Sequence, residues 1–360
     1  MNCYIHVPFC KNKCGYCAFY SETAVSKQLK EEYLNKLERD ISSVAVFHPE
    51  TIYIGGGTPT LLAVDELARL ANIIRRYFKP AGECEISIEC NPETLDAEKC
   101  ALLKEFVTRI SLGVQSFDEN LRNTLGRQCS TQALEKALSL IKEYKFPHFN
   151  CDLIYGIPNE SMEQWKDDLE KVADSGADHV SCYSLTPEEQ SRLGAAFIID
   201  DDAAVEMYNT AQTILSRHKI ERYEISNYAK KNAECRHNVN VWRGGKLIAF
   251  GPAGAGFDGK KRTINPENIH SWLNGNIQED DWLSPESRCR EIFAVNLRTS
   301  AGWHRNMWND FPVSWDKMRE IFCCAMESVP KEFYIIENDA VRLTPDGLLY
   351  WNDIAERIIL

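Results

Sequence analysis

The chain has 360 residues, of which 44 % are hydrophobic and 26 % are charged, a balance that supports a large core and excludes global disorder. Its formal net charge of −12 argues against a surface that coats nucleic acid, because phosphate binding needs clustered Lys and Arg. No apolar run approaches the roughly 20 residues of a membrane-spanning helix. The first residues also lack the basic and long apolar regions of a signal peptide, so we expect a cytoplasmic protein.

The first half of the chain alternates between short strands and helices. The predicted strands are Cys3–Val7, Thr51–Ile54, Cys84–Glu89, Arg109–Val114, Phe149–Ile154 and His179–Leu185. Between them, apolar residues at helical spacing predict four helices around 29–41, 67–77, 134–141 and 165–172, with Thr131 as the N-cap of the third. Repeated strand–helix units imply parallel strands with right-handed crossovers, in a barrel or in an open doubly wound sheet.

The second half of the chain loses this rhythm. Its predicted elements are a helix over 201–217, strands over Tyr223–Ser226 and Leu247–Gly251, helices near Ser287–Leu297 and Trp315–Met326, a β-turn-β signal ending at 341–344, and a final helix. We therefore expect a barrel over 1–200, an extension of the barrel over 201–284 and a separate C-terminal domain over 285–360.

Fourteen cysteines are many for a reducing compartment, where disulfides are rare. Only Cys10, Cys14 and Cys17 have the spacing of metal ligands, directly after the first strand; the scattered cysteines fit small buried hydrophobes. Three thiolates leave one coordination position open, which suits a four-iron cluster with one open iron better than a closed structural zinc site. A zinc site completed by His6 stays an alternative from the spacing alone.

Polar and glycine residues follow several of the predicted strands. The loop Gly55–Thr60 follows the second strand, and its glycines let the backbone approach a ligand closely. Glu89, Gln115 and Asp152 stand at the ends of later strands. Because parallel strands end at one edge of a sheet, we expect these side chains to surround one mouth next to the cysteines.

The pattern Cys-x3-Cys-x2-Cys resembles the signature of the radical S-adenosylmethionine (SAM) superfamily. Tyr16 occupies the aromatic position before the last cysteine, where that superfamily packs adenine. The resemblance implies a 4Fe-4S cluster on the three cysteines, whose open iron chelates the amino and carboxylate groups of SAM. Reductive cleavage of the sulfonium then gives methionine and a deoxyadenosyl radical.

Further motifs, in the same order along the chain, are similar to those of the HemN/HemW branch of this superfamily. They are Tyr4 with His6–Cys10, the Gly55–Pro59 loop, Glu89-x-Asn91-Pro92, Gly113–Ser116, Leu125-Gly126-Arg127, Asp152–Gly156 and the closing Arg342–Leu348. The resemblance implies an α/β fold, a partial (β/α)6 TIM-like barrel with a smaller C-terminal α+β domain. It also implies SAM contacts from Tyr4, Tyr16, Gly56, Gly57, Thr58, Glu89, Gln115, Arg127 and Asp152.

Two functions occur within this branch. Oxygen-independent coproporphyrinogen III oxidases carry a fourth cysteine two residues after the third, and this chain has Phe19 at that position. The oxidases also carry a long segment before the first strand, whereas this sequence begins at the strand. HemW-type haem chaperones carry His-Asn-x-x-Tyr-Trp, which resembles His237-Asn238 with Trp242 here. The resemblance implies that His237 coordinates haem iron, with Trp242 against the macrocycle.

The haem motif departs from the branch pattern at two positions. Val241 replaces its Tyr, and Cys129 stands where Leu-Gly-Arg-x-His would place a His, so the axial ligands of haem are left open. Cys235, two residues before His237, is an alternative thiolate ligand.

The resulting hypothesis is a haem chaperone that holds a 4Fe-4S cluster and SAM and delivers haem to haem proteins such as respiratory enzymes. The alternative is a radical SAM oxidoreductase acting on a porphyrinogen, for which the sequence identifies no catalytic residue. The implied partners are haem, haem-accepting proteins that can be membrane-associated, and an electron donor such as flavodoxin or ferredoxin. We expect no nucleic-acid partner and leave a homodimer open.

Overall fold

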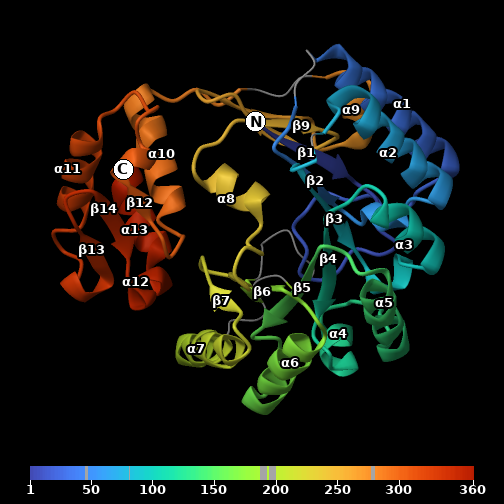
Figure 1. Cartoon of the computed structure of the whole chain (residues 1–360), viewed down its shortest axis with the longest axis horizontal. Coiled ribbons are helices and arrows are strands. Elements are labelled where there is room, and N and C mark those ends of the chain that lie inside the picture. Colours follow the sequence, from blue (N-terminus) through green and yellow to red (C-terminus); the bar gives the residue numbers. More distant parts are fainter. Residues whose placement is uncertain (45–47, 81, 187–192, 194–199, 277–279) are drawn as a thin grey trace.

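The computed structural model describes residues 1–44, 48–80, 82–186, 193, 200–276 and 280–360 (Figure 1). Within these residues, the larger part of the molecule is built on an 11-stranded sheet. Its centre consists of six parallel strands that pair in chain order. They are β1 (Asn2–Val7), β2 (Thr51–Gly56), β3 (Glu85–Cys90), β4 (Arg109–Gln115), β5 (His148–Tyr155) and β6 (His179–Ser184).

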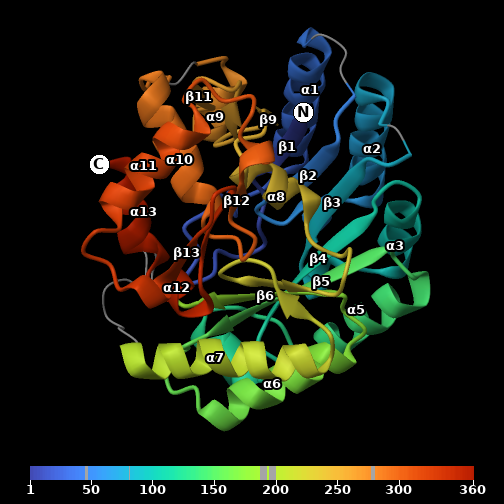
Figure 2. The same cartoon turned by 60° about the vertical axis from the view of Figure 1, so that its left-hand side comes forward.

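Helices between these strands cover the outer face of the sheet (Figure 2). They are α1 (Lys27–Ser43), α2 (Val64–Phe78), α3 (Ala97–Lys104), α4 (Glu119–Thr124), α5 (Thr131–Tyr144) and α6 (Met162–Asp174). Side-chain oxygens start several of them, as expected for N-caps. The cap of α5 is Ser130, which accepts a hydrogen bond from the Ala133 amide, so the prediction of Thr131 was wrong by one residue.

The strand order settles which α/β architecture the chain adopts. In a doubly wound sheet the strand order reverses at a switch point, whereas β1 to β6 lie side by side in chain order. Within the described residues β1 and β6 do not pair: β9 (Leu247–Phe250) lies beside β1, and antiparallel β8 (Asn227–Ala229) lies beside β6. The predicted partial (β/α)6 barrel is therefore confirmed.

The chain between the barrel and its C-terminal part extends both edges of the sheet. Its elements are α7 (Asp201–Arg217), β7 (Glu221–Arg222), α8 (Arg236–Trp242), β10 (Ala255–Phe257), β11 (Arg262–Ile264) and α9 (Ile269–Leu273). The strand predicted over Tyr223–Ser226 is wrong, because these residues form the turn between β7 and β8. The Glu224 carboxylate closes this turn by accepting hydrogen bonds from the Ser226 amide and the Asn227 side chain.

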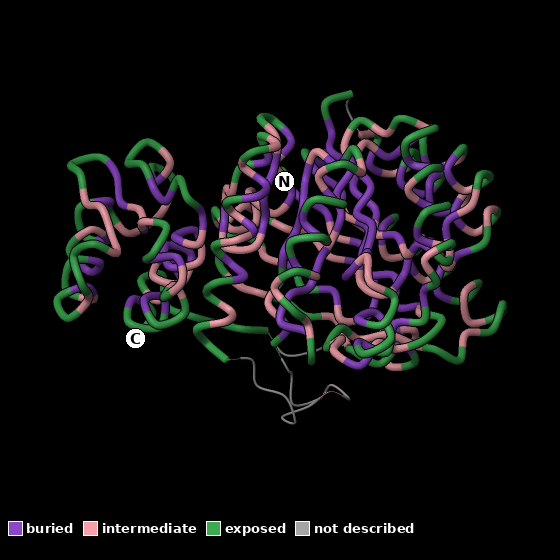
Figure 3. The backbone as a smooth tube through the Cα atoms, turned by 90° about the horizontal axis from the view of Figure 1, so that it is seen from below, coloured by how far each residue is buried: buried purple, intermediate pink, exposed green. Residues whose placement is uncertain are grey.

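The C-terminal part has its own core and lies beside the barrel, with α8 between them (Figure 1). It contains α10 (Pro285–Asn296), β12 (Trp303–His304), α11 (Trp315–Ala325), β13 (Tyr334–Ile336), β14 (Ala340–Leu343), α12 (Pro345–Leu349) and α13 (Trp351–Ile359). Aromatic rings fill this core: Phe293 stacks on Trp303, and Trp308 meets both of them edge-on. Figure 3 shows buried backbone in both parts. Among the described helices, none combines the length and apolar character needed to cross a membrane.

Candidate cofactor site

A cavity of about 460 Å³ opens at the carboxyl ends of the barrel strands. We call it the mouth cavity. It is lined by every predicted site residue except Tyr4 and His237, namely Cys10, Cys14, Tyr16, Cys17, Gly56, Gly57, Thr58, Glu89, Gln115, Arg127 and Asp152. The expectation that these residues gather at one mouth is therefore met. Phe19, at the position of the oxidase's fourth cysteine, also lines the cavity and is 67 % exposed.

The cysteine loop is tied to the barrel by backbone hydrogen bonds. The Cys10 amide donates to Glu22 O at 2.9 Å, and the Gly15 amide donates to Leu125 O at 2.9 Å. Burial raises the pKa of the Cys10 and Cys17 thiols. Among the described residues, no three His, Cys, Asp or Glu side chains converge on one metal position. A four-iron cluster takes each thiolate on a different iron, so it fits thiols that share a cavity without converging.

His6, the fourth ligand of the zinc alternative, is occupied inside the fold. Its Nδ1 lies 3.1 Å from the Tyr4 hydroxyl and its Nε2 lies 3.1 Å from Tyr20 O. Burial lowers the pKa of His6, so the ring is neutral near neutral pH. Tyr4 itself stacks on Tyr53, with ring centroids 6.2 Å apart, and reaches the mouth cavity only through that ring.

The glycine loop after β2 packs tightly against the start of the cysteine loop. The Gly57 amide donates to Val7 O at 2.9 Å, and the Thr58 amide donates to Phe9 O at 2.7 Å. Gly56 has φ +108°, and a Cβ there would lie 2.5 Å from the His6 ring. Glycine is required at this position for two reasons: other residues are strained at this φ, and the His6 ring leaves no space for a side chain.

Glu89 lies on the wall of the mouth cavity beneath the glycine loop. Its carboxylate accepts hydrogen bonds from the Gly56 amide at 2.9 Å and from the Tyr53 hydroxyl at 3.0 Å. Burial, assisted by the nearby charge of Asp152, raises the pKa of Glu89 to about 7. A cation placed in the cavity would favour the ionised form of this carboxyl.

A buried guanidinium, that of Arg127, lines the same cavity, and its charge lowers the pKa of Asp152. Arg127 donates to Asn91 Oδ1 at 2.8 Å and to Gly113 O at 2.6 Å, and its Nε has no hydrogen-bond partner among the described residues. Gln115 has φ +70°, where the register between β4 and β5 shifts. The cavity thus offers charges of both signs, which fits a ligand with an ammonium, a carboxylate and a sulfonium.

His237 lies outside the mouth cavity, at the amino ends of the strands. Its ring is 5 % exposed and its Nδ1 lies 2.8 Å from the Thr51 hydroxyl, which donates its single hydrogen to Asn2 Oδ1 at 2.9 Å. The Thr51 oxygen must therefore accept from His237, which assigns the Nδ1–H tautomer and leaves a lone pair on Nε2. Burial lowers the pKa of His237 to about 4, so the imidazole is neutral.

Charged residues that the sequence analysis missed hold the start of α8. Glu85 accepts hydrogen bonds from the Arg236 amide at 3.1 Å and from the His237 amide at 2.9 Å. Arg109 lies 3.5 Å from the Glu85 carboxylate and donates to Ala233 O at 2.7 Å. We call this group, with His237 and Thr51, the α8 site. Its signal in the sequence was a charged residue at the start of two buried parallel strands, Glu85 on β3 and Arg109 on β4.

The two cysteines considered with the haem motif are also buried, whereas Trp242 is half-buried. Burial raises the pKa of Cys235 to about 12, which disfavours the thiolate that a haem ligand would need. Cys129 is 3 % exposed and does not line the mouth cavity. The Trp242 ring lies under the Arg298 guanidinium of the C-terminal part, at 4.8 Å.

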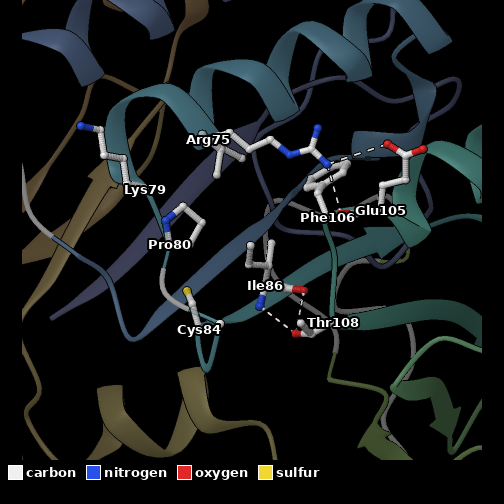
Figure 4. A pocket seen from close by; sticks show the side chains of 10 residues that line it. Arg75, Lys79, Pro80, Cys84, Ile86, Glu105, Phe106 and Thr108 are labelled. Carbon is white, nitrogen blue, oxygen red and sulfur yellow. Dashed lines mark hydrogen bonds and ion pairs between the residues drawn. The ribbon is translucent and has the colours of Figure 1, made fainter.

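A second hollow, of about 390 Å³, lies between the end of α2 and the amino ends of β3 and β4 (Figure 4). The Arg75 guanidinium lies over the Phe106 ring and 3.9 Å from the Glu105 carboxylate. The Ile86 amide donates to the Thr108 hydroxyl at 2.9 Å. None of the predicted site residues lines this hollow.

The sequence pattern of the Radical SAM superfamily matches residues 4–172. The Heme chaperone HemW of Bacillus subtilis is 30 % identical over 371 residues, covering 98 % of this chain and 97 % of the relative. The Heme chaperone HemW of Haemophilus influenzae is 29 % identical over 378 residues, covering 99 % and 97 %. The solved structure of coproporphyrinogen III oxidase (HemN) from Escherichia coli has a TM-score of 0.85, and the match covers 99 % of this chain and 89 % of the HemN chain. The sequence identity is 20 %, so this match supports the fold alone.

With the cysteine loop, the glycine loop and these matches together, the chain belongs to the radical SAM superfamily, whose members hold a 4Fe-4S cluster and SAM. Within that superfamily it belongs to the HemN/HemW branch, as the 30 % identity over nearly the whole of both chains shows.

Proposed function

We propose that this protein is a haem chaperone, which binds haem and passes it to haem proteins. The observation that carries the proposal is the similarity to proteins named Heme chaperone HemW over nearly the whole length of both chains. Phe19 adds support, because it stands on the cavity wall where an oxidase has its fourth cysteine. Respiratory enzymes are the acceptors we propose, some of them membrane-associated.

For the mouth cavity we propose a 4Fe-4S cluster on Cys10, Cys14 and Cys17 with SAM beside it. The bound cluster supplies an electron and an open iron, fed by a donor such as flavodoxin or ferredoxin. Glu89 and Asp152 attract the positive charges of SAM, and Arg127 faces its carboxylate. Tyr16 packs the adenine, while Gly56, Gly57, Thr58 and Gln115 contact SAM directly, and Tyr4 supports it through Tyr53.

For haem we propose His237 as an axial ligand. Its neutral ring and the lone pair on Nε2 match what iron requires, and the hydrogen bond from Nδ1–H to Thr51 is the kind that orients metal-bound imidazoles. Since His237 is 5 % exposed, haem binding requires the start of α8 to move away from the strands.

We further propose that the protein has three parts, divided at residues 200 and 284. We propose a cytoplasmic location, and a homodimer as an assembly to be tested.

A haem-transfer assay tests this function. Haem-loaded protein is mixed with an apo haem protein such as apomyoglobin, and the spectrum of the acceptor is followed with and without SAM and the reduced cluster. Haem should move to the acceptor faster than it dissociates into buffer containing a haem scavenger. In a parallel anaerobic assay with coproporphyrinogen III, SAM and reductant, we expect no protoporphyrinogen IX. Formation of that product at a catalytic rate, without haem transfer, would favour the oxidase.

A further inference from the structure

From Ser111 on the wall of the mouth cavity, beside Asp152, polar side chains continue across the sheet to residues that do not line the cavity. Ser111 on β4, Asn150 on β5 and His179 on β6 are neighbours in register. Each is at most 5 % exposed. Parallel strands buried on both faces ordinarily carry apolar residues, so a polar row at this depth needs partners within the row.

The partners connect the row into one chain from Tyr223 to Asp152. Tyr223 Oη lies 2.8 Å from His179 Nε2, and His179 Nδ1 lies 2.6 Å from Asn150 Oδ1. The Asn150 amide group donates to Asp152 Oδ1 at 2.8 Å and to Ser111 Oγ at 2.7 Å. The Ser111 hydroxyl donates to Asp152 Oδ2 at 3.1 Å.

Every hydrogen bond in this chain has a fixed direction. Asn150 Oδ1 can only accept, so His179 carries its hydrogen on Nδ1 and must accept at Nε2 from the Tyr223 hydroxyl. The Tyr223 oxygen in turn accepts from the Cys235 amide at 3.3 Å. All donors therefore point toward Asp152, and each step polarises the next in the same sense.

The far end of the chain is anchored in the C-terminal part, since the Ser300 amide donates to Tyr223 O at 3.0 Å. The near end faces the other charged and titratable groups of the cavity. These are Arg127, Glu89 on β3, Tyr53 on β2 and Tyr183 on β6. Burial raises the pKa of Asp152, while the hydrogen bonds from Asn150, Ser181 and Ser111 lower it. The ionisation of Asp152 thus depends in part on donors that do not line the mouth cavity, namely Asn150 and Ser181.

We infer that Ser111, Asn150, His179 and Tyr223 are positioning residues that keep Asp152 an oriented carboxylate and thereby set the affinity of the mouth cavity for SAM. The inference rests on the proposed SAM site. SAM carries a positive sulfonium, so a neutral Asp152 would bind it less well than a charged one. Weakening the donors to Asp152 through this hydrogen-bonded row leaves the effect of burial less opposed, so the pKa of Asp152 rises and SAM binding weakens most at low pH.

The test measures SAM affinity by calorimetry on cluster-loaded protein at about pH 6.5 and pH 8.5. For His179→Phe, which removes both ring nitrogens, we expect about tenfold weaker binding relative to wild type at the lower pH and recovery toward wild type at the higher one. His179→Asn keeps a donor at the place of Nδ1 and should restore most of the affinity. Tyr223→Phe should also weaken SAM binding at the lower pH, but by less than His179→Phe.

Tyr228→Phe is the matched control, because it removes a buried hydroxyl that has no hydrogen-bond partner among the described residues and lies outside the chain. A second readout needs no SAM: the infrared band of a protonated carboxyl, absent in Asp152→Asn, should titrate at higher pH in His179→Phe and Tyr223→Phe than in wild type. The inference would be overturned if wild type, His179→Phe and Tyr223→Phe had the same ratio of SAM affinities at the two pH values and the same infrared titration. Failure of wild type to bind SAM would contradict the proposed SAM site instead. The infrared titration would still show whether the hydrogen-bonded row controls the pKa of Asp152.

Discussion

The two ends of the barrel are built differently. The mouth cavity is open, its cysteines are half-buried, and its charged groups Glu89, Arg127 and Asp152 face the open volume. The α8 site at the opposite end is closed, with Glu85, Arg109 and His237 each at most 5 % exposed and hydrogen-bonded. The first is shaped to receive a cofactor as it stands, whereas the second must open before its histidine can bind iron. Separate changes should therefore disable one end and spare the other.

The largest expected effect is loss of the cluster on replacing any of Cys10, Cys14 or Cys17 by Ala. With two thiolates the cluster has too few protein ligands, so we expect near-complete loss of bound iron and sulfide after anaerobic reconstitution. Cys323→Ala, at an exposed cysteine on α11, is the control and should keep full iron content. Hemin binding should survive in all four variants. Wild-type iron content in the Cys14→Ala protein would contradict the assignment.

The next effect concerns the closed end. Glu85→Ala leaves Arg109 buried without its carboxylate and removes the acceptor of two α8 amides. Breaking such a buried pair costs about 3–5 kcal/mol, measurable by denaturant unfolding. Because α8 is released, hemin should associate faster than with wild type in stopped-flow mixing. A comparison with Glu105→Ala, whose carboxylate is largely exposed, separates this effect from a general loss of surface charge. Slower hemin association in Glu85→Ala would argue against opening at α8.

A smaller effect is expected at the mouth from Gly56→Ala. The backbone at φ +108° and the close approach of His6 should cost about 1–3 kcal/mol of stability and displace the glycine loop from the cysteine loop. SAM affinity should fall while hemin affinity is unchanged. Gly82→Ala is the matched control, because its added Cβ would meet no atom within 4 Å. Equal stability of the two variants would refute the packing account of the loop.

The smallest effect is a proton released when SAM binds. Since the pKa of Glu89 is about 7, part of the free protein holds a neutral carboxyl near neutral pH, and a bound cation lowers that pKa. Affinity should therefore rise from about pH 6 to about pH 8. Calorimetry in buffers of different ionisation enthalpy should detect the proton in wild type and a smaller release in Glu89→Gln. Identical release in both proteins would exclude Glu89 as its source.

The contrast between the two ends also explains what the sequence could predict. The cysteine and glycine loops are local patterns, and their backbone contacts with each other need only adjacent strands, so their meeting at one mouth followed from strand order. His237 was visible as a residue, but its enclosure was not. Its hydrogen-bond partner Thr51 is 186 positions away, and nothing near either residue encodes the pairing.

Errors of detail had local causes. Ser130 and Thr131 are both good N-caps, and spacing alone does not choose between them. The segment Tyr223–Ser226 has apolar residues that favour a strand, but the Glu224 carboxylate accepts hydrogen bonds from the Ser226 amide and the Asn227 side chain and closes a turn. The polar row of Ser111, Asn150 and His179 lies inside predicted strands and was not identified. Its signal was the presence of polar residues in parallel strands that are buried on both faces.

Titration with hemin tests the central claim most directly. Wild type, His237→Ala and the control His48→Ala, whose histidine is exposed and lies 3.2 Å from Lys79 O, are titrated while the Soret band is followed. The account predicts saturable binding in wild type and in His48→Ala, and loss or strong weakening of it in His237→Ala with SAM binding preserved. Absence of saturable binding in wild type, or equal binding by His237→Ala, would contradict it.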